Sequence, residues 1–259
     1  MKLHVEVTGS GEPLLLIHGL GSASTAWKPL IPALTSHYQV ITVDLPGHGQ
    51  SPLDHTTALD PESLARLIIT YLDQMKISKL HVVGNSLGGW VALELAALAP
   101  ERVKSVVALA PAGLWLKPDF TRVRGEARAR LMAKALHKPA PKLLKYKFAR
   151  QLGFSTVSPK WNELDIETCI DATIAMGTSR GYFPTWDAFL GKRFDEEISP
   201  EIPVTIIFGD TDNTLPAHTS QERSLAPKHA KWIVIPNCGH APMWDHPAEV
   251  LTYIHETCR

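Results

Sequence analysis

Short runs of apolar and mostly β-branched residues recur along the chain, and most of them are separated by stretches long enough for one helix. A continuously apolar run of roughly four to eight residues is typical of a strand in a parallel sheet that is covered on both faces. Strands that alternate with helices in this way predict an α/β protein. The predicted strands are residues 14–17, 40–43, 80–83, 103–109, 204–208 and 232–235.

Three helices can be placed from their boundary residues. Asp60 followed by Pro61 is typical of a helix N-cap and a first helical position. A second helix is predicted to begin at Ser86 and to end before Pro100, because proline cannot continue a helix. The C-terminal segment from about His246 is predicted to form a third.

The alternation is interrupted between residues 112 and 199, where helical patterns and aromatic residues occur without a convincing strand. An apolar stripe at helical spacing, typical of an amphipathic helix, comprises Val123, Ala127, Leu131, Met132, Ala135 and Leu136. We therefore predict an α/β core of residues 1–111 and 200–259, and a helical cap inserted at residues 112–199.

Charge is balanced over the chain but concentrated in the predicted cap. The 259 residues include 26 basic and 26 acidic ones, and this formal net charge of zero gives no general attraction toward nucleic acid. Residues 122–150, in contrast, contain ten Lys or Arg and one acid, Glu126. A solvated helix face is the favoured interpretation of this segment. The alternative is a basic surface for an anionic substrate or a membrane.

The N-terminal segment and the cysteines predict an intracellular, cytoplasmic protein. The chain alternates apolar and polar residues from Leu3 to Val7 and lacks the apolar stretch of a signal peptide. No run approaches the roughly 20 apolar residues of a membrane span. Cys169, Cys238 and Cys258 are odd in number and far apart, so we expect free thiols in a reducing compartment. The oligomeric state is left open.

The strongest chemical signal is the segment Gly84-Asn85-Ser86-Leu87-Gly88, which follows a predicted strand and opens a helix. This is the G-x-S-x-G pattern of a nucleophile elbow, in which a sharp strand-to-helix turn presents the serine oxygen above the sheet. Glycine is needed where a side chain would collide or where φ must be positive. Ser86 is therefore the predicted nucleophile.

A serine hydroxyl needs a base that accepts its proton and a carboxylate that orients this base. His240 follows the last predicted strand, and an aspartate follows the strand before it, in the segment GDTDNTLP. Loops at these strand ends form the crevice sites of open α/β sheets. His18 is the main rival for the base. It lies in HGLG after an early strand, where the backbone N–H groups of Leu20 and Leu87 can form an oxyanion hole.

The sequence contains no dinucleotide-binding fingerprint, P-loop or cluster with metal-ligand spacing. We therefore expect no cofactor and no metal. A small-molecule substrate is the expected partner, and no nucleic acid is expected to bind.

Five segments occur in the order and spacing of a known family: HGLGS, DLPGHGQS, GNSLGG, FGDTDNTLP and GHAP. With them the whole chain resembles the α/β-hydrolase superfamily, of the capped kind that includes carboxylesterases, lactonases and carbon–carbon bond hydrolases. The resemblance implies a mostly parallel sheet of about seven or eight strands flanked by helices. It also implies that Asp212 is the acid of the triad and that residues 46–51 form a structural turn near the site.

Two departures from the family pattern bear on fold and function. The usual N-terminal hairpin has two strands, yet only residues 3–7 precede GSGEP, so the first strand is expected to be missing and the sheet to have seven strands. Ala241 follows His240, where carbon–carbon bond hydrolases commonly resemble one another in carrying a tryptophan. Asn85 before the nucleophile is shared with that group but is not unique to it.

A substrate pocket is expected between the cap and the sheet. Its candidate residues are Asn85, Trp90, Trp161, Arg180, Phe183, Trp186 and Trp244. The favoured function is a serine carboxylesterase that acts on a small or medium apolar ester. One alternative is a carbon–carbon bond hydrolase of ring-cleavage dienoates with the same triad, in which Arg180 would hold the substrate carboxylate. A further alternative is a ligand receptor on a hydrolase fold, because fold does not fix function.

Overall fold

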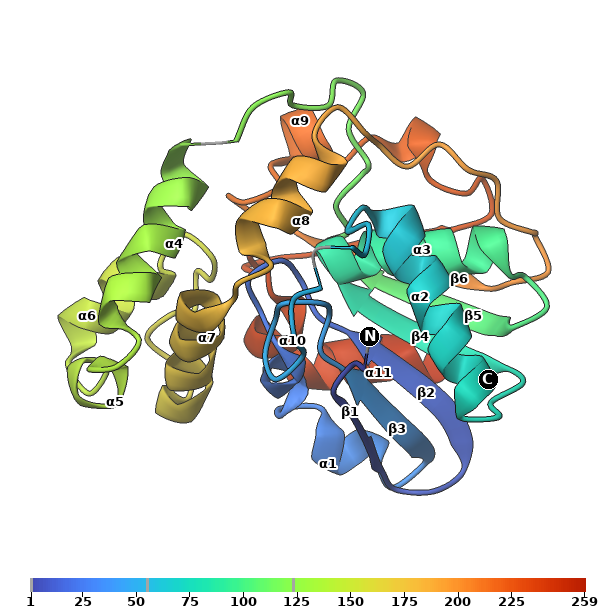
Figure 1. Ribbon diagram of the computed structural model, residues 1–259, viewed down its shortest axis with the longest axis horizontal. Helices are drawn as coiled ribbons and strands as arrows, with labels where there is room; N and C mark the ends of the chain where they lie inside the picture. Colours follow the sequence, from blue (N-terminus) through green and yellow to red (C-terminus); the bar gives the residue numbers. More distant parts are fainter. Residues whose placement is uncertain (1, 55, 123) are drawn as a thin grey trace.

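A single twisted sheet lies at the centre of the molecule (Figure 1). The computed structural model describes residues 2–54, 56–122 and 124–259. Over these residues the sheet has seven strands in the order β1-β3-β2-β4-β5-β6-β7. β1 is antiparallel to β3, and the other neighbouring strands are parallel. The strands are β1 Val5–Thr8, β2 Glu12–Ile17, β3 Tyr38–Val43, β4 Leu80–Asn85, β5 Val103–Leu109, β6 Val204–Gly209 and β7 Lys231–Ile235.

The sequence predicted this sheet closely. Every predicted apolar run forms a strand; β5 has the predicted bounds, and the others are longer by one or two residues. A single strand precedes β2, which confirms the seven-stranded form. β4 and β6 are buried along their whole length, as expected for inner strands of a sheet that helices cover on both faces.

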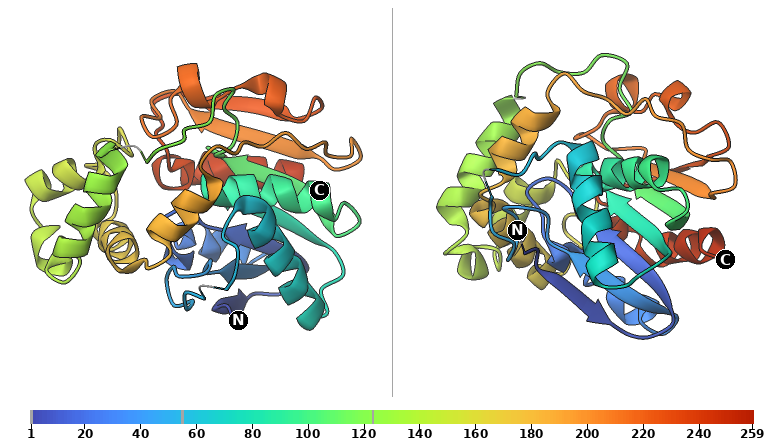
Figure 2. Two further views of the ribbon diagram at one scale, coloured as in Figure 1. Left: turned by 45° about the horizontal axis from the view of Figure 1, so that its top comes forward. Right: turned by 45° about the vertical axis from the view of Figure 1, so that its right-hand side comes forward.

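Helices cover the two faces of the sheet in separate layers (Figures 1 and 2). Leu15 and Ile17 of β2 pack into the apolar cluster that includes α2 and α3. Leu14 and Leu16, which point to the opposite face, pack into a second cluster that includes α11. The helices of the core are α1 Ile31–Leu34, α2 Pro61–Gln74, α3 Leu87–Leu98, α9 Ala217–Ser220, α10 Pro242–Asp245 and α11 Pro247–Thr257, with 3₁₀ turns at Ser24–Trp27 and Arg223–Leu225.

Over the described residues, five helices lie between β5 and β6, where the cap was predicted, and we call them the cap. In Figures 1 and 2, α4 to α7 project from one end of the sheet and α8 lies closer to the core. The cap has its own apolar cluster, which includes Leu144, Phe154 and Cys169. Its division from the core at residues 112 and 199 stays a prediction. The cap helices are α4 Arg124–Leu136, α5 Ala140–Leu143, α6 Lys147–Phe154, α7 Ile166–Thr178 and α8 Tyr182–Phe189.

The apolar stripe predicted on α4 faces outward, which corrects the amphipathic interpretation of this segment. Leu131 is 58% exposed, and Met132 and Leu136 are exposed as well, whereas Arg130 is 7% exposed. The Arg130 guanidinium donates hydrogen bonds to the carbonyls of Gly177 (3.2 Å) and Ser179 (2.6 Å). These carbonyls lie at the C-terminal end of α7 and have no partner within the helix, so the Arg130 guanidinium supplies their hydrogen bonds. Because Arg130 occupies the inward side of α4, the predicted apolar stripe faces outward. Val123, also part of the predicted stripe, lies outside the described residues.

The three cysteines are buried as free thiols in three different places. Cys169 lies in the apolar cluster of the cap, Cys238 lies just before the loop residue His240, and Cys258 follows α11. Burial raises the pKa of Cys169 and of Cys258 to about 11, and it raises the pKa of Cys238 further. Among the described helices, none is both long and apolar enough to cross a membrane.

Candidate active site

Ser86 stands at a strained turn between β4 and α3. Its backbone has φ 55° and ψ −118°, a conformation that residues other than glycine rarely adopt. The turn is possible because strand, helix and the neighbouring strand come into backbone contact: a side chain at Gly84 would overlap the Gly88 carbonyl, and one at Gly88 would overlap the Ile17 carbonyl. This geometry is that of a nucleophile elbow, and strain of this kind is typical of functional sites.

His240 and Asp212 meet on the loops that follow β7 and β6. His240 Nδ1 lies 2.9 Å from Asp212 Oδ2, and the Asp212 side chain is fully buried. The other carboxylate oxygen, Oδ1, accepts hydrogen bonds from the backbone N–H groups of Thr214 (2.9 Å) and Leu215 (2.8 Å). With one oxygen fixed by the backbone, the second is held in place to accept the Nδ1 proton of His240, which leaves Nε2 as the basic nitrogen.

Asn85 links the elbow to the histidine loop. Its side-chain nitrogen donates to the carbonyls of Leu109 and His240, each at 3.1 Å. The backbone N–H of His240 donates to the Val157 carbonyl of the cap at 2.8 Å. Both backbone groups of His240 are therefore held by residues far away in the sequence. Asn85 has a positioning role in this geometry, and contact with a substrate stays a prediction.

The loop after β2 touches the elbow from the other side. A side chain at Gly19 would lie 3.0 Å from the Ser86 Cβ, so the backbone that leads to Leu20 passes close to the nucleophile. Leu87 is the first residue of α3, where backbone N–H groups are free of helical partners. The assignment of the Leu20 and Leu87 N–H groups to an oxyanion hole stays a prediction that this proximity supports.

His18 is engaged in the scaffold of this loop. It is fully buried, its Nδ1 lies 2.8 Å from the Gly19 carbonyl, and its Nε2 accepts from the Leu45 N–H at 3.0 Å. Burial lowers its pKa and keeps the ring neutral. With both ring nitrogens in use, His18 is poorly placed to act as the base.

The segment after β3 is a turn organised by one carboxylate. Asp44 Oδ1 accepts from the Ser24 N–H at 2.7 Å, and Oδ2 accepts from the Gln50 N–H at 2.8 Å. His48 within this turn is buried, and burial lowers its pKa to about 3. These contacts agree with a structural turn at residues 46–51.

A buried contact that the sequence did not predict joins the cap to the histidine loop. The Asp245 carboxylate accepts from the Ser158 hydroxyl and, at 2.7 Å, from the Gly239 N–H. Asp245 is 5% exposed, and burial raises its pKa. Gly239 immediately precedes His240, so the Ser158–Asp245 pair fixes the loop one residue away from the predicted base. Ser158 and Asp245 are 87 positions apart in the sequence, so no local sequence pattern predicts that they pair.

The predicted pocket residues fall into separate groups. Trp161 and Trp244 both pack against the apolar cluster of the cap, and the Trp244 indole donates to the Ala26 carbonyl at 3.0 Å. Phe183 and Trp186 lie on α8 around the ring of Tyr182, with ring centroids 5.2 and 5.6 Å away. Both groups border the interface between cap and core. Arg180 is exposed at the end of α7, so its role as a carboxylate clamp stays a prediction.

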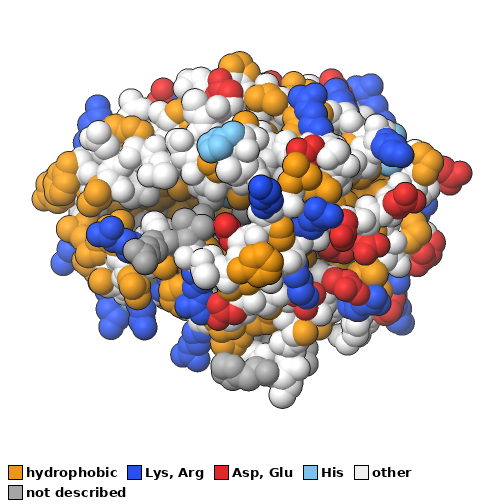
Figure 3. All heavy atoms as spheres, turned by 90° about the horizontal axis from the view of Figure 1, so that it is seen from above, with side chains coloured by type: hydrophobic (Ala, Val, Ile, Leu, Met, Phe, Trp, Pro, Cys, Tyr) orange, Lys and Arg blue, Asp and Glu red, His pale blue; other side chains and the backbone are white. Residues whose placement is uncertain are grey.

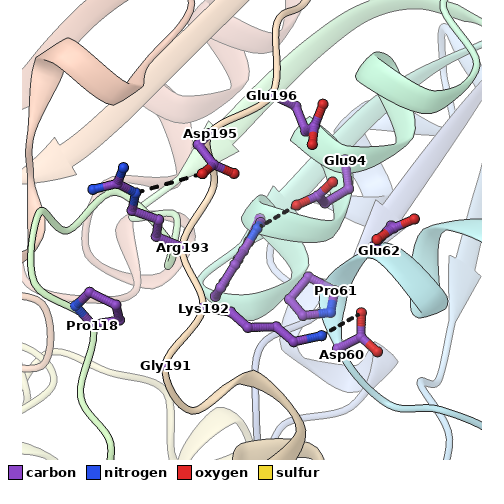
Figure 4. A pocket seen from close by; sticks show the side chains of 11 residues that line it. Asp60, Pro61, Glu62, Glu94, Pro118, Gly191, Lys192, Arg193, Asp195 and Glu196 are labelled. Carbon is purple, nitrogen blue, oxygen red and sulfur yellow. Dashed lines mark hydrogen bonds and ion pairs between the residues drawn. The ribbon is translucent and has the colours of Figure 1, made fainter.

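Trp90 lies elsewhere, in the main core cluster one turn into α3. It lines a cavity of about 480 Å³ between α2, α3 and the loop around Lys192 (Figure 4). The Trp90 indole donates to Glu94 at 2.8 Å, and burial raises the pKa of Glu94 to about 7. In the part of the chain that the structure describes, no group of three His, Cys, Asp or Glu side chains is arranged to hold a metal ion.

Comparisons with known proteins identify the family of the chain. A family model described as alpha/beta hydrolase fold matches residues 12–247, and the chain belongs to this family. It is 28% identical over 99% of both chains to a pimeloyl-[acyl-carrier protein] methyl ester esterase of Legionella pneumophila. It is 42% identical to the dihydrolipoyllysine-residue acetyltransferase component of the acetoin cleaving system of Pseudomonas putida, over 40% of this chain but 28% of that protein.

Solved structures share the fold. The enol-lactonase of Burkholderia xenovorans superimposes with a TM-score of 0.76 and 20% identity, over 98% of this chain and 95% of that one. Family membership and these relatives support a hydrolase.

Proposed function

We propose that this protein is a serine esterase that cleaves a small or medium apolar carboxylic ester through an acyl-enzyme. The observation that carries the proposal is the 2.9 Å hydrogen bond between His240 and a buried, doubly anchored Asp212, beside a serine on a strained elbow. The full-length Legionella relative is named as a methyl ester esterase, which supports an ester as the substrate.

Acylation begins when Ser86 Oγ attacks the carbonyl carbon of the ester while His240 Nε2 accepts the hydroxyl proton. Asp212 stabilises the imidazolium that forms, because its Oδ2 accepts the Nδ1 proton. The carbonyl oxygen becomes an oxyanion that the N–H groups of Leu20 and Leu87 stabilise. The carbon–oxygen bond to the alcohol then breaks, and His240 gives its proton to the departing alkoxide.

Deacylation repeats these steps with water. His240 Nε2 accepts a proton from a water molecule, whose oxygen attacks the acyl carbon. The bond to Ser86 Oγ breaks, the proton returns to that oxygen, and the carboxylic acid leaves. Aromatic groups at the interface of cap and core, Trp161 with Trp244 and Phe183 with Trp186, would favour an apolar acyl or alcohol part.

The test is a panel of p-nitrophenyl esters of increasing acyl length, lactones and ring-cleavage dienoates, combined with a fluorophosphonate probe. We expect the largest kcat/KM on an ester and a single label, on Ser86. Ser22→Ala, a serine change in the loop after β2, is the matched control and should keep the label, whereas Ser86→Ala should lose it. Label elsewhere, or a dienoate preferred by orders of magnitude, would contradict the proposal.

A further inference from the structure

One side of cap helix α6 is exposed although it carries large apolar side chains. Phe148 and Leu152 are each 68% exposed, and because they are four residues apart they share one side of the helix. The other side packs inward through Phe154, which is 6% exposed within the apolar cluster of the cap. In the described structure only this inward side of α6 is covered.

Basic residues lie close to the exposed apolar ones along the chain. Tyr146 is 60% exposed, with its ring 6.0 Å from that of Phe148. We define the α6 surface as Lys142, Lys145, Tyr146, Lys147, Phe148 and Leu152, all of them exposed. Hydrophobic and basic side chains lie side by side at the left edge of Figure 3, the end at which Figure 1 places α5 and α6.

The charge of this region has one sign. Residues 127–162 contain nine Lys or Arg and no Asp or Glu. Because the whole chain has 26 residues of each sign, this positive excess is matched by an equal negative excess elsewhere. On the face that Figure 3 shows, acidic side chains gather mainly on the right half, opposite the edge at which α5 and α6 lie. The α6 surface is therefore complementary to an anionic partner.

From this juxtaposition we propose that the α6 surface binds the surface of an anionic lipid bilayer. Aromatic and leucine side chains enter the boundary between headgroups and acyl chains, and the neighbouring lysines pair with anionic headgroups. A projecting helix fits a bilayer because a bilayer requires no matching shape. Two cavities of the described structure lie elsewhere, one between α2, α3 and the loop around Lys192 and the other beside β1.

Sedimentation with vesicles tests the proposal without any substrate, so its outcome is independent of the esterase proposal. Wild type should bind vesicles containing phosphatidylglycerol at least tenfold more tightly than pure phosphatidylcholine, and added salt should weaken this binding. A lysine near an anionic surface contributes roughly fivefold. Lys142→Glu with Lys145→Glu should therefore reduce binding at least about 25-fold, and Phe148→Ser with Leu152→Ser about tenfold.

Matched variants carry the same chemical changes away from α6. Lys79→Glu with Lys228→Glu and Phe120→Ser with Leu116→Ser alter exposed residues of the same types, and binding should stay within about twofold of wild type. Equal binding to both vesicle types, or equal loss in these controls, would overturn the proposal. Lysine-dependent binding to a purified acyl carrier protein without vesicle binding would also overturn it, in favour of an acidic protein partner. Hydrolysis of a dissolved ester should be unchanged in the α6 variants.

Discussion

Polar residues at the edge of the sheet that carries the proposed triad and polar residues on the cap differ in their surroundings. At the edge, Asp44, Asn85 and Asp212 are buried, and each is held by hydrogen bonds to two backbone groups. On the cap, the lysines of the α6 surface are exposed and stand among apolar side chains that nothing in the described structure covers. Chemistry at the edge depends on fixed positions, whereas the cap presents a surface for contact.

The two regions depend on each other where the cap meets the His240 loop. Cap residues contact His240 and the nearby Asp245: the Val157 carbonyl accepts the His240 N–H, the Ser158 hydroxyl contacts Asp245, and the Lys160 ammonium donates to the Asp245 carbonyl. In the proposed mechanism the cap thus helps to place the base through residues 157 and 158, which lie three and four residues after α6. Substitutions at the edge, at this junction and in the core should therefore have effects of clearly different size.

The largest effect is expected from removing the nucleophile. Ser86→Ala should lower kcat/KM by about 10⁴-fold or more, because the hydroxyl forms the covalent bond on which the proposed reaction depends. The midpoint of thermal unfolding should change by less than about 2 °C, since the side chain is small and only partly buried. A calorimetric scan and a kinetic assay measure the two values. If Ser86→Ala kept its activity, Ser86 would not be the nucleophile.

A loss of similar size is expected from Asp212→Asn, and a small one from Asp210→Asn. The amide that replaces Asp212 cannot accept the Nδ1 proton in the same way, so a kcat loss of about 10⁴-fold is expected. Asp210 is exposed and accepts a long hydrogen bond of 3.4 Å from the Cys238 N–H, so its variant should lose less than about threefold. If steady-state kinetics ranked the two variants the other way, the acid would have been misassigned.

An intermediate effect is expected at the junction of cap and core. Ser158→Ala removes the hydroxyl that contacts Asp245 and should loosen the Gly239–His240 loop. We expect kcat to fall roughly 10- to 100-fold while KM stays within about threefold, because misplacing a base slows chemistry more than binding. Ser155→Ala, an exposed cap serine three residues earlier, is the matched control. A lower melting temperature with unchanged kcat would mean that the pair only stabilises the fold.

An effect on stability and not on activity is expected at Glu94, a buried acid of the core whose pKa burial raises from 4.5 to about 7. Between these two pH values the folded protein holds a proton that the unfolded chain has released, so stability falls as the pH rises. Glu94→Gln removes this pH dependence. Relative to wild type, its free energy of unfolding should therefore be higher at pH 8 than at pH 4.5 by at most about 3 kcal/mol. Urea unfolding at both pH values measures it. The exposed Glu201→Gln is the control, and an equal gain there would exclude burial as the cause.

The parts of the structure that the sequence predicted depend on local chemistry. Each inner strand contains a mostly apolar run, and Asp60 accepts the Ser63 N–H at 3.3 Å as its pattern with Pro61 predicted. The elbow follows from the spacing of Gly84 and Gly88 around Ser86. The contacts that the sequence did not predict depend on residues far apart in the chain. The burial of Arg130 could not be predicted from its neighbours in the sequence, because the two carbonyls that it binds belong to the C-terminal end of α7. The contact between Asp245 and Ser158 likewise joins residues far apart in the sequence.

Modification of the three buried thiols can report the local opening of three parts of the molecule. A thiolate reacts and a thiol does not, so Cys169, Cys238 and Cys258, all with raised pKa values, stay silent toward alkylating reagents while their surroundings are closed. One reports on the cap, one on the loop that carries His240, and one on the end of α11. The order in which they become modified gives the order in which these three parts open.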